Sequence, residues 1–165
     1  MRRRNDEPMK PEVAQAKLEE LCAASERCSW ELMTKLHRWG IRGEEASAII
    51  DRLTKDRFID DERFARAFVT DKYRFSRWGR IKIRAALYAK RVPSWMIDEA
   101  MDEVDDREYA DNLLQLLRAK RRALGEEAAT YEGRTKLFRY GASRGYELPL
   151  IASAIKDAKL WRDDE

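Results

Sequence analysis

The sequence predicts an all-α protein made of three tandem three-helix repeats that form an elongated, curved array. Fifteen leucines against four valines, with only seven glycines and four prolines in 165 residues, favour helices over strands. Apolar residues recur at helical spacing, and related segments return along the chain at intervals of about 50 residues. A unit of that size buries little core alone, so we expect neighbouring units to stack.

The first repeat is expected over residues 11–58, after a disordered basic tail at 1–10. Pro11 suits the first turn of a helix, because the N–H that proline lacks would have no partner there. Gly40 suits a helix end, where the left-handed conformation is common. The helices of this repeat are predicted at 11–25, 29–39 and 44–55.

The second repeat is expected over residues 59–104 and opens with DDERFARAF at 60–68. This acidic cluster could be an acid/base site, but adjacent residues on a helix point about 100° apart, whereas a pair of hydrolytic carboxylates faces one substrate from two sides. Asp60 is instead placed to cap a helix, with Asp61 in its first turn. The predicted helices are 60–75, 79–91 and 94–104. The structural signature comprises Asp60, Asp61, Arg63, Phe64, Ala65 and Phe68.

The third repeat is expected over residues 105–159, followed by a C-terminal tail at 160–165. Its start, DDREYADNLL at 105–114, repeats the acids and the apolar stripe of residues 60–69 at an interval of 45. The middle segments also align, ELMTKLHRWGIRGEEASAII with KIRAALYAKRVPSWMIDEAM and with KLFRYGASRGYELPLIASAI. The predicted helices are 106–123, 131–143 and 148–158.

Positive charge gathers on the middle helix of each repeat. Residues 72–97 contain eight Lys or Arg and no acid, and 32–43 and 133–146 are shorter acid-free windows. A solvated helix face would also look like this, but three such windows favour a surface that binds an acidic ligand. On one continuous helix, the first four candidates would share an arc of roughly 60°. The candidates are Arg77, Arg80, Arg84, Arg91, Lys35, Arg38, Arg42, Arg134, Lys136 and Arg139.

Little in the sequence favours catalysis or metal binding. Cys22, Cys28 and the single histidine, His37, are too few for a zinc site, which needs about four ligands, and no phosphate-binding glycine loop occurs. We expect no enzyme activity and no cofactor. No apolar run approaches the roughly 20 residues of a membrane span, so a cytoplasmic monomer is expected.

The segment DDERFARAF, preceded by IIDRLTKDRFI, resembles the RecX family of regulators of the RecA recombinase. Gly40-Ile41, Gly79 with Ile83, and KLFRYGASRGY add to a resemblance that spans about residues 11–158. Arg91 departs from it, because it stands where the family often has glycine.

The resemblance implies three tandem three-helix repeats and a protein that binds the RecA filament. It implies inhibition of recombinase, ATPase and co-protease activities, in DNA recombination, repair and the SOS response. The basic helical faces would then occupy the filament.

The alternative is a free-standing nucleic-acid-binding protein that contacts single- or double-stranded DNA without RecA. Residues 31–50 could form two helices about a glycine turn. The presumed recognition helix, 44–55, begins with two glutamates, which would repel phosphates.

Overall fold

The computed structural model of the protein describes residues 7–160. Over this range it holds nine α-helices, one short 3-10 helix and no strand, which confirms the all-α prediction. Every α-helix lies within two residues of its predicted bounds. The helices are α1 (Pro11–Ala24), α2 (Ser29–Arg38), α3 (Gly43–Lys55), α4 (Asp61–Arg74), α5 (Arg80–Ala89), α6 (Ser94–Asp102), α7 (Asp106–Leu124), η1 (Gly125–Ala129), α8 (Tyr131–Ser143) and α9 (Leu148–Asp157).

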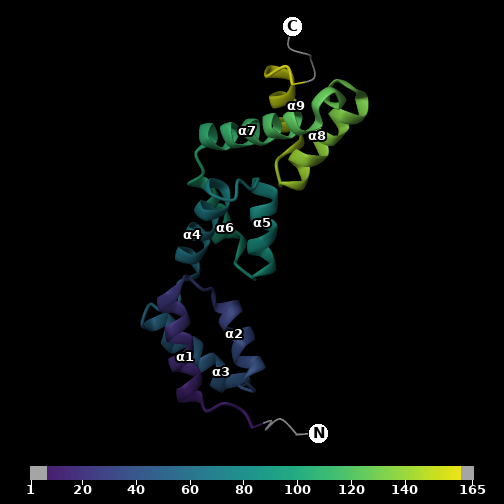
Figure 1. Cartoon of the computed structure of the whole chain (residues 1–165). Helices are drawn as coiled ribbons and strands as arrows, with labels where there is room; N and C mark the ends of the chain where they lie inside the picture. The colour runs from purple at the N-terminus through teal and green to yellow at the C-terminus, as the bar shows by residue number, and fades with distance from the viewer. Residues whose placement is uncertain (1–6, 161–165) are drawn as a thin grey trace, which may run out of the picture.

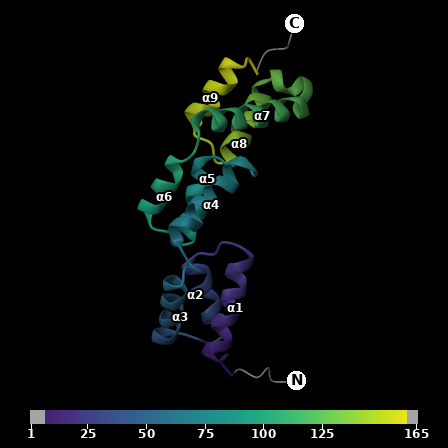
Figure 2. The same cartoon turned by 90° about the vertical axis from the view of Figure 1, so that its left-hand side faces the viewer.

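The helices form three consecutive groups along an elongated, curved molecule (Figures 1 and 2). The first repeat, α1–α3, lies at one end, the second, α4–α6, in the middle, and the third, α7–α9, at the other end. The middle helices α2, α5 and α8 lie along the same side of the array in Figure 1. We keep the predicted boundaries after residues 58 and 104 as our proposal for the limits of the repeats.

The acids that open the second and third repeats cap helices, as predicted. The Asp60 carboxylate accepts a hydrogen bond from the Arg63 N–H at 3.0 Å, and the Asp105 carboxylate accepts one from the Glu108 N–H at 2.8 Å. Asp61 lies in the first turn of α4, as predicted, but its hydrogen bonds go to another helix. Its carboxylate accepts hydrogen bonds from the N–H (2.8 Å) and the hydroxyl of Ser29 and so caps α2 of the first repeat.

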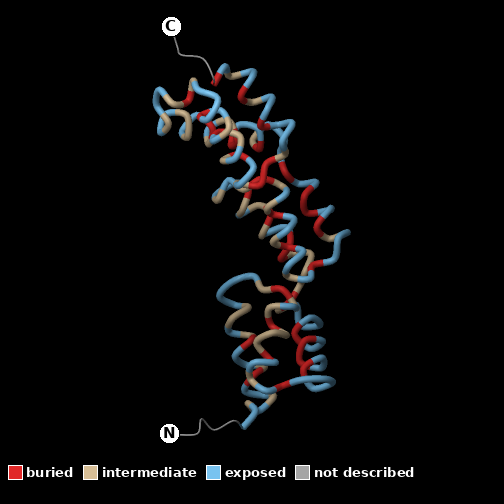
Figure 3. The backbone as a smooth tube through the Cα atoms, turned by 90° about the vertical axis from the view of Figure 1, so that its right-hand side faces the viewer, coloured by how far each residue is buried: buried red, intermediate tan, exposed pale blue. Residues whose placement is uncertain are grey.

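Positions that align between the repeats are buried in all three. Buried residues run along the interior of the array in Figure 3. The aligned and buried sets are Leu32, Ile83 and Leu137; Ile41, Val92 and Tyr146; and Ile50, Met101 and Ile155. The stripe of α4 is likewise buried at Phe64, Ala65, Val69 and Tyr73, with Phe68 half-buried.

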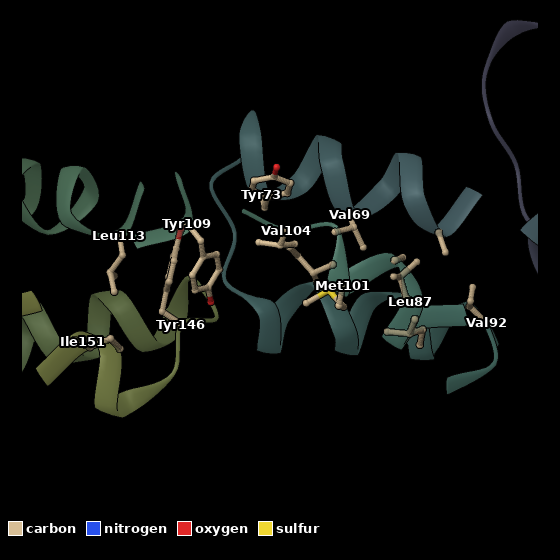
Figure 4. Close-up of a cluster of buried hydrophobic side chains, with 14 of the residues drawn as sticks. Val69, Tyr73, Leu87, Val92, Met101, Val104, Tyr109, Leu113, Tyr146 and Ile151 are labelled. Carbon is tan, nitrogen blue, oxygen red and sulfur yellow. The ribbon is translucent and has the colours of Figure 1, made fainter. Parts of the chain in front are cut away.

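The buried side chains form two hydrophobic clusters rather than one. One cluster fills the first repeat and includes Leu18, Leu36 and Leu53, together with Ile59 from just beyond the proposed boundary. The other runs through the second and third repeats and includes Tyr109 and Tyr146 of the third repeat, whose ring centroids are 4.9 Å apart (Figure 4). Their hydroxyls reach the second repeat, since Tyr109 accepts from the Arg80 N–H and Tyr146 donates to the Arg77 carbonyl. The first repeat therefore has a core of its own.

The two junctions between repeats differ in kind. The first and second repeats meet through polar groups: Asp61 with Ser29, Arg63 with Glu26 at 2.6 Å, and Lys90 with Glu31 at 2.5 Å. The second and third repeats meet through hydrogen bonds and close contacts between their backbones. The Gly79 N–H donates to the Arg144 carbonyl at 2.7 Å, and a Cβ on Gly79 would lie 2.1 Å from the carbonyl carbon of Gly145.

The predicted tails fall partly outside the described range. Residues 1–6 and 161–165 are outside it. The described end of the N-terminal segment contacts the first repeat, since the Met9 N–H donates to the Trp39 carbonyl at 3.0 Å. Leu160, predicted as the first residue of the C-terminal tail, is buried against the third repeat, because the left-handed turn at Lys159 brings it back so that its N–H donates to the Ile155 carbonyl at 3.1 Å.

Candidate partner-binding surface

Arg80 joins the second and third repeats. Its N–H donates to the Tyr109 hydroxyl at 2.9 Å, and its guanidinium lies 3.9 Å from the centroid of the Tyr109 ring. Ion pairs connect it to Asp106 at 2.5 Å and to Glu147 at 3.6 Å. The sequence window around Arg80 contains no acid, which predicted that no carboxylate would lie near it. This prediction is wrong, because the third repeat supplies both carboxylates.

The same junction holds two tyrosines with altered acidity. Burial raises the pKa of Tyr109, whose hydroxyl donates to Glu147 at 2.7 Å. Burial also raises the pKa of Tyr146 to about 12, although Arg144 and Arg77 oppose the rise. Both phenols are therefore neutral at physiological pH, and they act as hydrogen-bond donors within the junction.

Arg84 lies one turn after Arg80 and faces a hollow of about 480 Å³ on α5, which Ile81 and Tyr88 also line. It pairs with Asp98 at 2.6 Å, and both side chains are about half exposed. Such exposed pairs contribute only about 0–1 kcal/mol. A carboxylate or phosphate of a partner can therefore compete with Asp98.

Arg77 and Arg91 lie outside α5, one on each side of it. Both have left-handed backbone conformations, with φ of 53° and 59°. The four arginines therefore do not share one continuous helix. Arg77 precedes α5, in agreement with the predicted bounds of 79–91, whereas Arg91, predicted as the last residue of that helix, follows it. Both side chains are exposed, and no residue in the range 7–160 forms an ion pair with them within 4 Å.

The cations of the first repeat are likewise divided by a turn. Lys35 and Arg38 lie in the last turn of α2, where they stabilise the helix dipole. Arg42 is the N-cap residue of α3, so the three cations do not share one helix face. Arg38 and Arg42 are exposed and Lys35 is half-buried, and none of them has an ion pair with a described residue.

The three candidates of the third repeat all lie on α8. Lys136 pairs with Glu127, and the Arg134 guanidinium donates weakly, at 3.4 Å, to the Ala129 carbonyl. Arg139 is exposed and has no ion pair with the described part of the chain. Among the ten candidates, only Arg80, Arg84 and Lys136 therefore form ion pairs within residues 7–160.

Exposed aromatic side chains lie near these cations, and the acid-free segment 72–97 already pointed to Phe75, Trp78 and Tyr88 in the sequence, but not to Tyr131. Phe75 and Tyr88 are 80% and 70% exposed, and Tyr131 of α8 is 82% exposed. Lys72 and Lys82 lie over the ring of the half-buried Trp78, at 4.8 and 4.4 Å from its centroid. The only sequence signal for Tyr131 was its place just before the acid-free window 133–146.

The buried cysteine and the single histidine lie at opposite ends of α2. Burial raises the pKa of Cys28 to about 11, so its thiol is neutral and unreactive at physiological pH. His37 is exposed at the end of α2, and the described residues hold no cluster of three or more metal-binding side chains. Nor is any described helix both long and apolar enough to span a bilayer.

Comparison with known proteins places the sequence in a family. A family model described as the second three-helix domain of RecX matches residues 60–101. The regulatory protein RecX of Chlorobium limicola is 30% identical over 132 residues, which cover 76% of this chain and 77% of that protein. The chain belongs to the RecX family. The regulatory protein RecX of Clostridium botulinum strain Alaska E43 is 33% identical over 129 residues, or 78% of this chain.

The family fold extends over most of the chain. The crystal structure of RecX from Lactobacillus salivarius superimposes with a TM-score of 0.79 at 18% identity, covering 91% of this chain and 97% of that one. The match to Clostridium botulinum RecX covers only 60% of that protein's length. The RecX family relatives are named regulatory proteins, and the fold agrees with theirs.

Proposed function

We propose that this RecX family protein binds the RecA nucleoprotein filament and restrains its recombinase, ATPase and co-protease activities. The observation that carries the proposal is the set of exposed cations beside α2, α5 and α8, most of which have no ion pair with a described residue. These middle helices lie along one side of the array (Figure 1). That side therefore offers charges that a partner can neutralise without first breaking an internal pair.

The mechanism we infer is occupancy of the filament. Each helix of 10 to 14 residues is roughly 15–20 Å long, so three repeats in a row can contact more than one protomer of a helical polymer. Contacts at one repeat raise the effective concentration of the other two, so weak individual contacts add to tight binding on an assembled filament. No bond-breaking chemistry is required of the protein.

The test is a titration of the DNA-dependent ATPase of RecA with this protein at two salt concentrations. Reversing Arg38 and Arg139 to Glu should raise the half-inhibitory concentration by about tenfold, because two exposed attractions of up to about 1 kcal/mol each are replaced by repulsions. Lys55→Glu, at the exposed end of α3 and outside the set of candidate cations, should inhibit like the wild type. Unchanged inhibition by the double variant, with wild-type helicity, would remove these cations from the binding surface.

A second candidate, DNA binding without RecA, draws support from the exposed rings of Phe75 and Tyr88 in the acid-free segment. Bases stack on such rings. The two functions differ in salt dependence and stoichiometry. Neutralising about four phosphates of a single strand gives a log–log salt slope of about −2.8, whereas a RecA-directed inhibitor acts at concentrations too low to coat the DNA.

A further inference from the structure

The third repeat carries an apolar hollow of about 510 Å³ between α8 and α9 that no described segment covers. Tyr131 and Leu148 are 82% and 57% exposed at its rim. Ile155 of α9 and Phe138 of α8 form its deeper part. Exposed apolar side chains that gather around one hollow are typical of a binding site rather than of ordinary surface.

Cations lie at both edges of this hollow. At 100° per residue, Arg134 and Arg139 are about 140° apart around α8, and the lining residues Tyr131 and Phe138 fall between them. Within residues 7–160, no carboxylate lines the hollow. Arg139 has no ion pair with a described residue, and Arg134 has only its long contact with the Ala129 carbonyl. The hollow thus presents an apolar strip between two available positive charges.

The groove on the other side of α9 has a different charge. This second groove, of about 340 Å³ between α7 and α9, is lined by the exposed Leu150 and by Asp111, Asp157 and Arg118. Its acids outnumber its bases, whereas the α8/α9 hollow has bases only. Helix α9 therefore separates two apolar grooves of similar shape and opposite charge, and this contrast allows a matched test.

We propose that the α8/α9 hollow binds an amphipathic helical segment of an acidic protein partner. The apolar face of the segment packs on Tyr131, Phe138 and Leu148, and carboxylates on either side of that face pair with Arg134 and Arg139. This is the helix-in-groove mode, in which an apolar stripe gives affinity and flanking charges give orientation. A nucleic acid fits less well, because its phosphates would lie against an almost wholly apolar surface that offers only two cations to neutralise them.

The inference deepens the proposed function, on which it rests for the biological identity of the partner. It adds the chemistry of the segment that the partner must present. Its test contains no RecA, so its failure is distinct from a failure of the proposed function.

The probe is a fluorescein-labelled synthetic helix of about 14 residues, long enough to follow α8 over roughly 20 Å. It carries a Leu and Phe stripe flanked by Glu, and a matched peptide has Lys at every Glu position. Fluorescence anisotropy with the full chain should show the acidic peptide binding at least about tenfold more tightly than the basic one. Leu148→Ser and Arg139→Glu should each weaken binding of the acidic peptide about tenfold.

Leu150→Ser is the matched control, because it removes an exposed leucine two positions away on α9 that lines the other groove. It should bind the acidic peptide like the wild type, and circular dichroism should show equal helicity for all variants. Equal affinity for the two peptides, or equal loss in Leu150→Ser, would overturn the proposal.

Two further outcomes would assign the hollow to another occupant and also overturn the proposal. One is binding of oligothymidine that is lost in both Leu148→Ser and Arg139→Glu. The other is self-association of the wild type, detected by sedimentation, that Leu148→Ser abolishes. Loss of peptide binding in Leu148→Ser together with loss of RecA inhibition would place the partner's segment on RecA. Inhibition that persists in this variant would separate the hollow from the RecA contact.

Discussion

The residues that follow the three middle helices share one backbone conformation. Gly40, Arg91 and Gly145 follow α2, α5 and α8 with φ of +83°, +59° and +93°. In each case the next residue donates its N–H to a carbonyl five positions back, as in Ile41 to Leu36 and Val92 to Leu87. This is the Schellman helix end, which glycine favours. Arg91 adopts it without that freedom.

The first prediction concerns this arginine. Because a residue with a Cβ pays about 1–2 kcal/mol in the left-handed region, Arg91→Gly should raise the free energy of unfolding by about 1 kcal/mol, measured by urea denaturation. The exposed guanidinium has no ion pair with a described residue, so its loss should cost little. Arg91→Ala keeps the Cβ and removes the charge, and should leave stability nearly unchanged. A glycine variant no more stable than the alanine variant would contradict the conformational explanation.

At the residue scale, the sequence predicted the contacts that a residue makes with its near neighbours along the chain. Asp60 and Asp105 cap helices through an N–H three positions away, so a local pattern suffices to identify them. Asp61 lies next to Asp60 in the same pattern, yet its carboxylate accepts a hydrogen bond from the N–H of Ser29, which lies 32 positions earlier in the chain. The pairing of Arg80 with Asp106 and Glu147 is likewise a property of how the second repeat meets the third. Periodicity within one helix carries no information on such contacts.

At the scale of the helices, α5 is held by the turn that ends α8. The Gly79 N–H donates to the Arg144 carbonyl and the Ile81 N–H to the Gly145 carbonyl, so the first turn of α5 is satisfied by the third repeat. Gly79 has an ordinary φ of −77°. Its lack of a side chain matters because the backbone of Gly145 and Tyr146 lies against it.

Gly79→Ala should therefore destabilise the protein by about 3 kcal/mol, as overpacking against backbone does, without any penalty from φ. Urea denaturation gives the magnitude, and near-ultraviolet circular dichroism should report the disturbed packing of Tyr109 and Tyr146. Gly43→Ala is the comparison, because φ is +60° there and nothing lies within 4 Å of the added Cβ. Its cost should be about 1 kcal/mol, from the backbone alone. Equal costs at the two positions would show that the close approach is absent.

Helix periodicity and the repeat alignment sufficed to place all nine α-helices, because each repeat buries equivalent positions such as Leu32, Ile83 and Leu137. The alignment could not show that one junction is packed backbone and the other is polar. Both junctions depend on residues outside the aligned stripes, among them Gly79 and Arg63. The apolar hollow on α8 was missed for the same reason, since Tyr131 and Leu148 come from different helices.

At the scale of the whole molecule, we expect the array to unfold as two cooperative bodies rather than as three equal units or one. The first repeat has its own hydrophobic cluster, and the second and third share another. Ion pairs and hydrogen bonds connect the two bodies. Of the described residues of the first repeat, Cys28 alone belongs to the larger cluster. In stacked repeats, stability is a sum of unit and interface contributions, so a weak interface separates the unfolding of its two sides.

Residue-resolved amide hydrogen exchange should detect this division. Leu36→Ala removes a fully buried side chain from the first cluster at a cost of about 3 kcal/mol. It should accelerate exchange of the most protected amides in α1–α3 roughly hundredfold while leaving α7–α9 unchanged. Leu113→Ala in the larger cluster should do the reverse and should accelerate exchange in α4–α9 together, because that cluster runs through both repeats. If either variant accelerated all nine helices equally, the polar junction would be as strong as the packed one and the molecule would unfold as a single body.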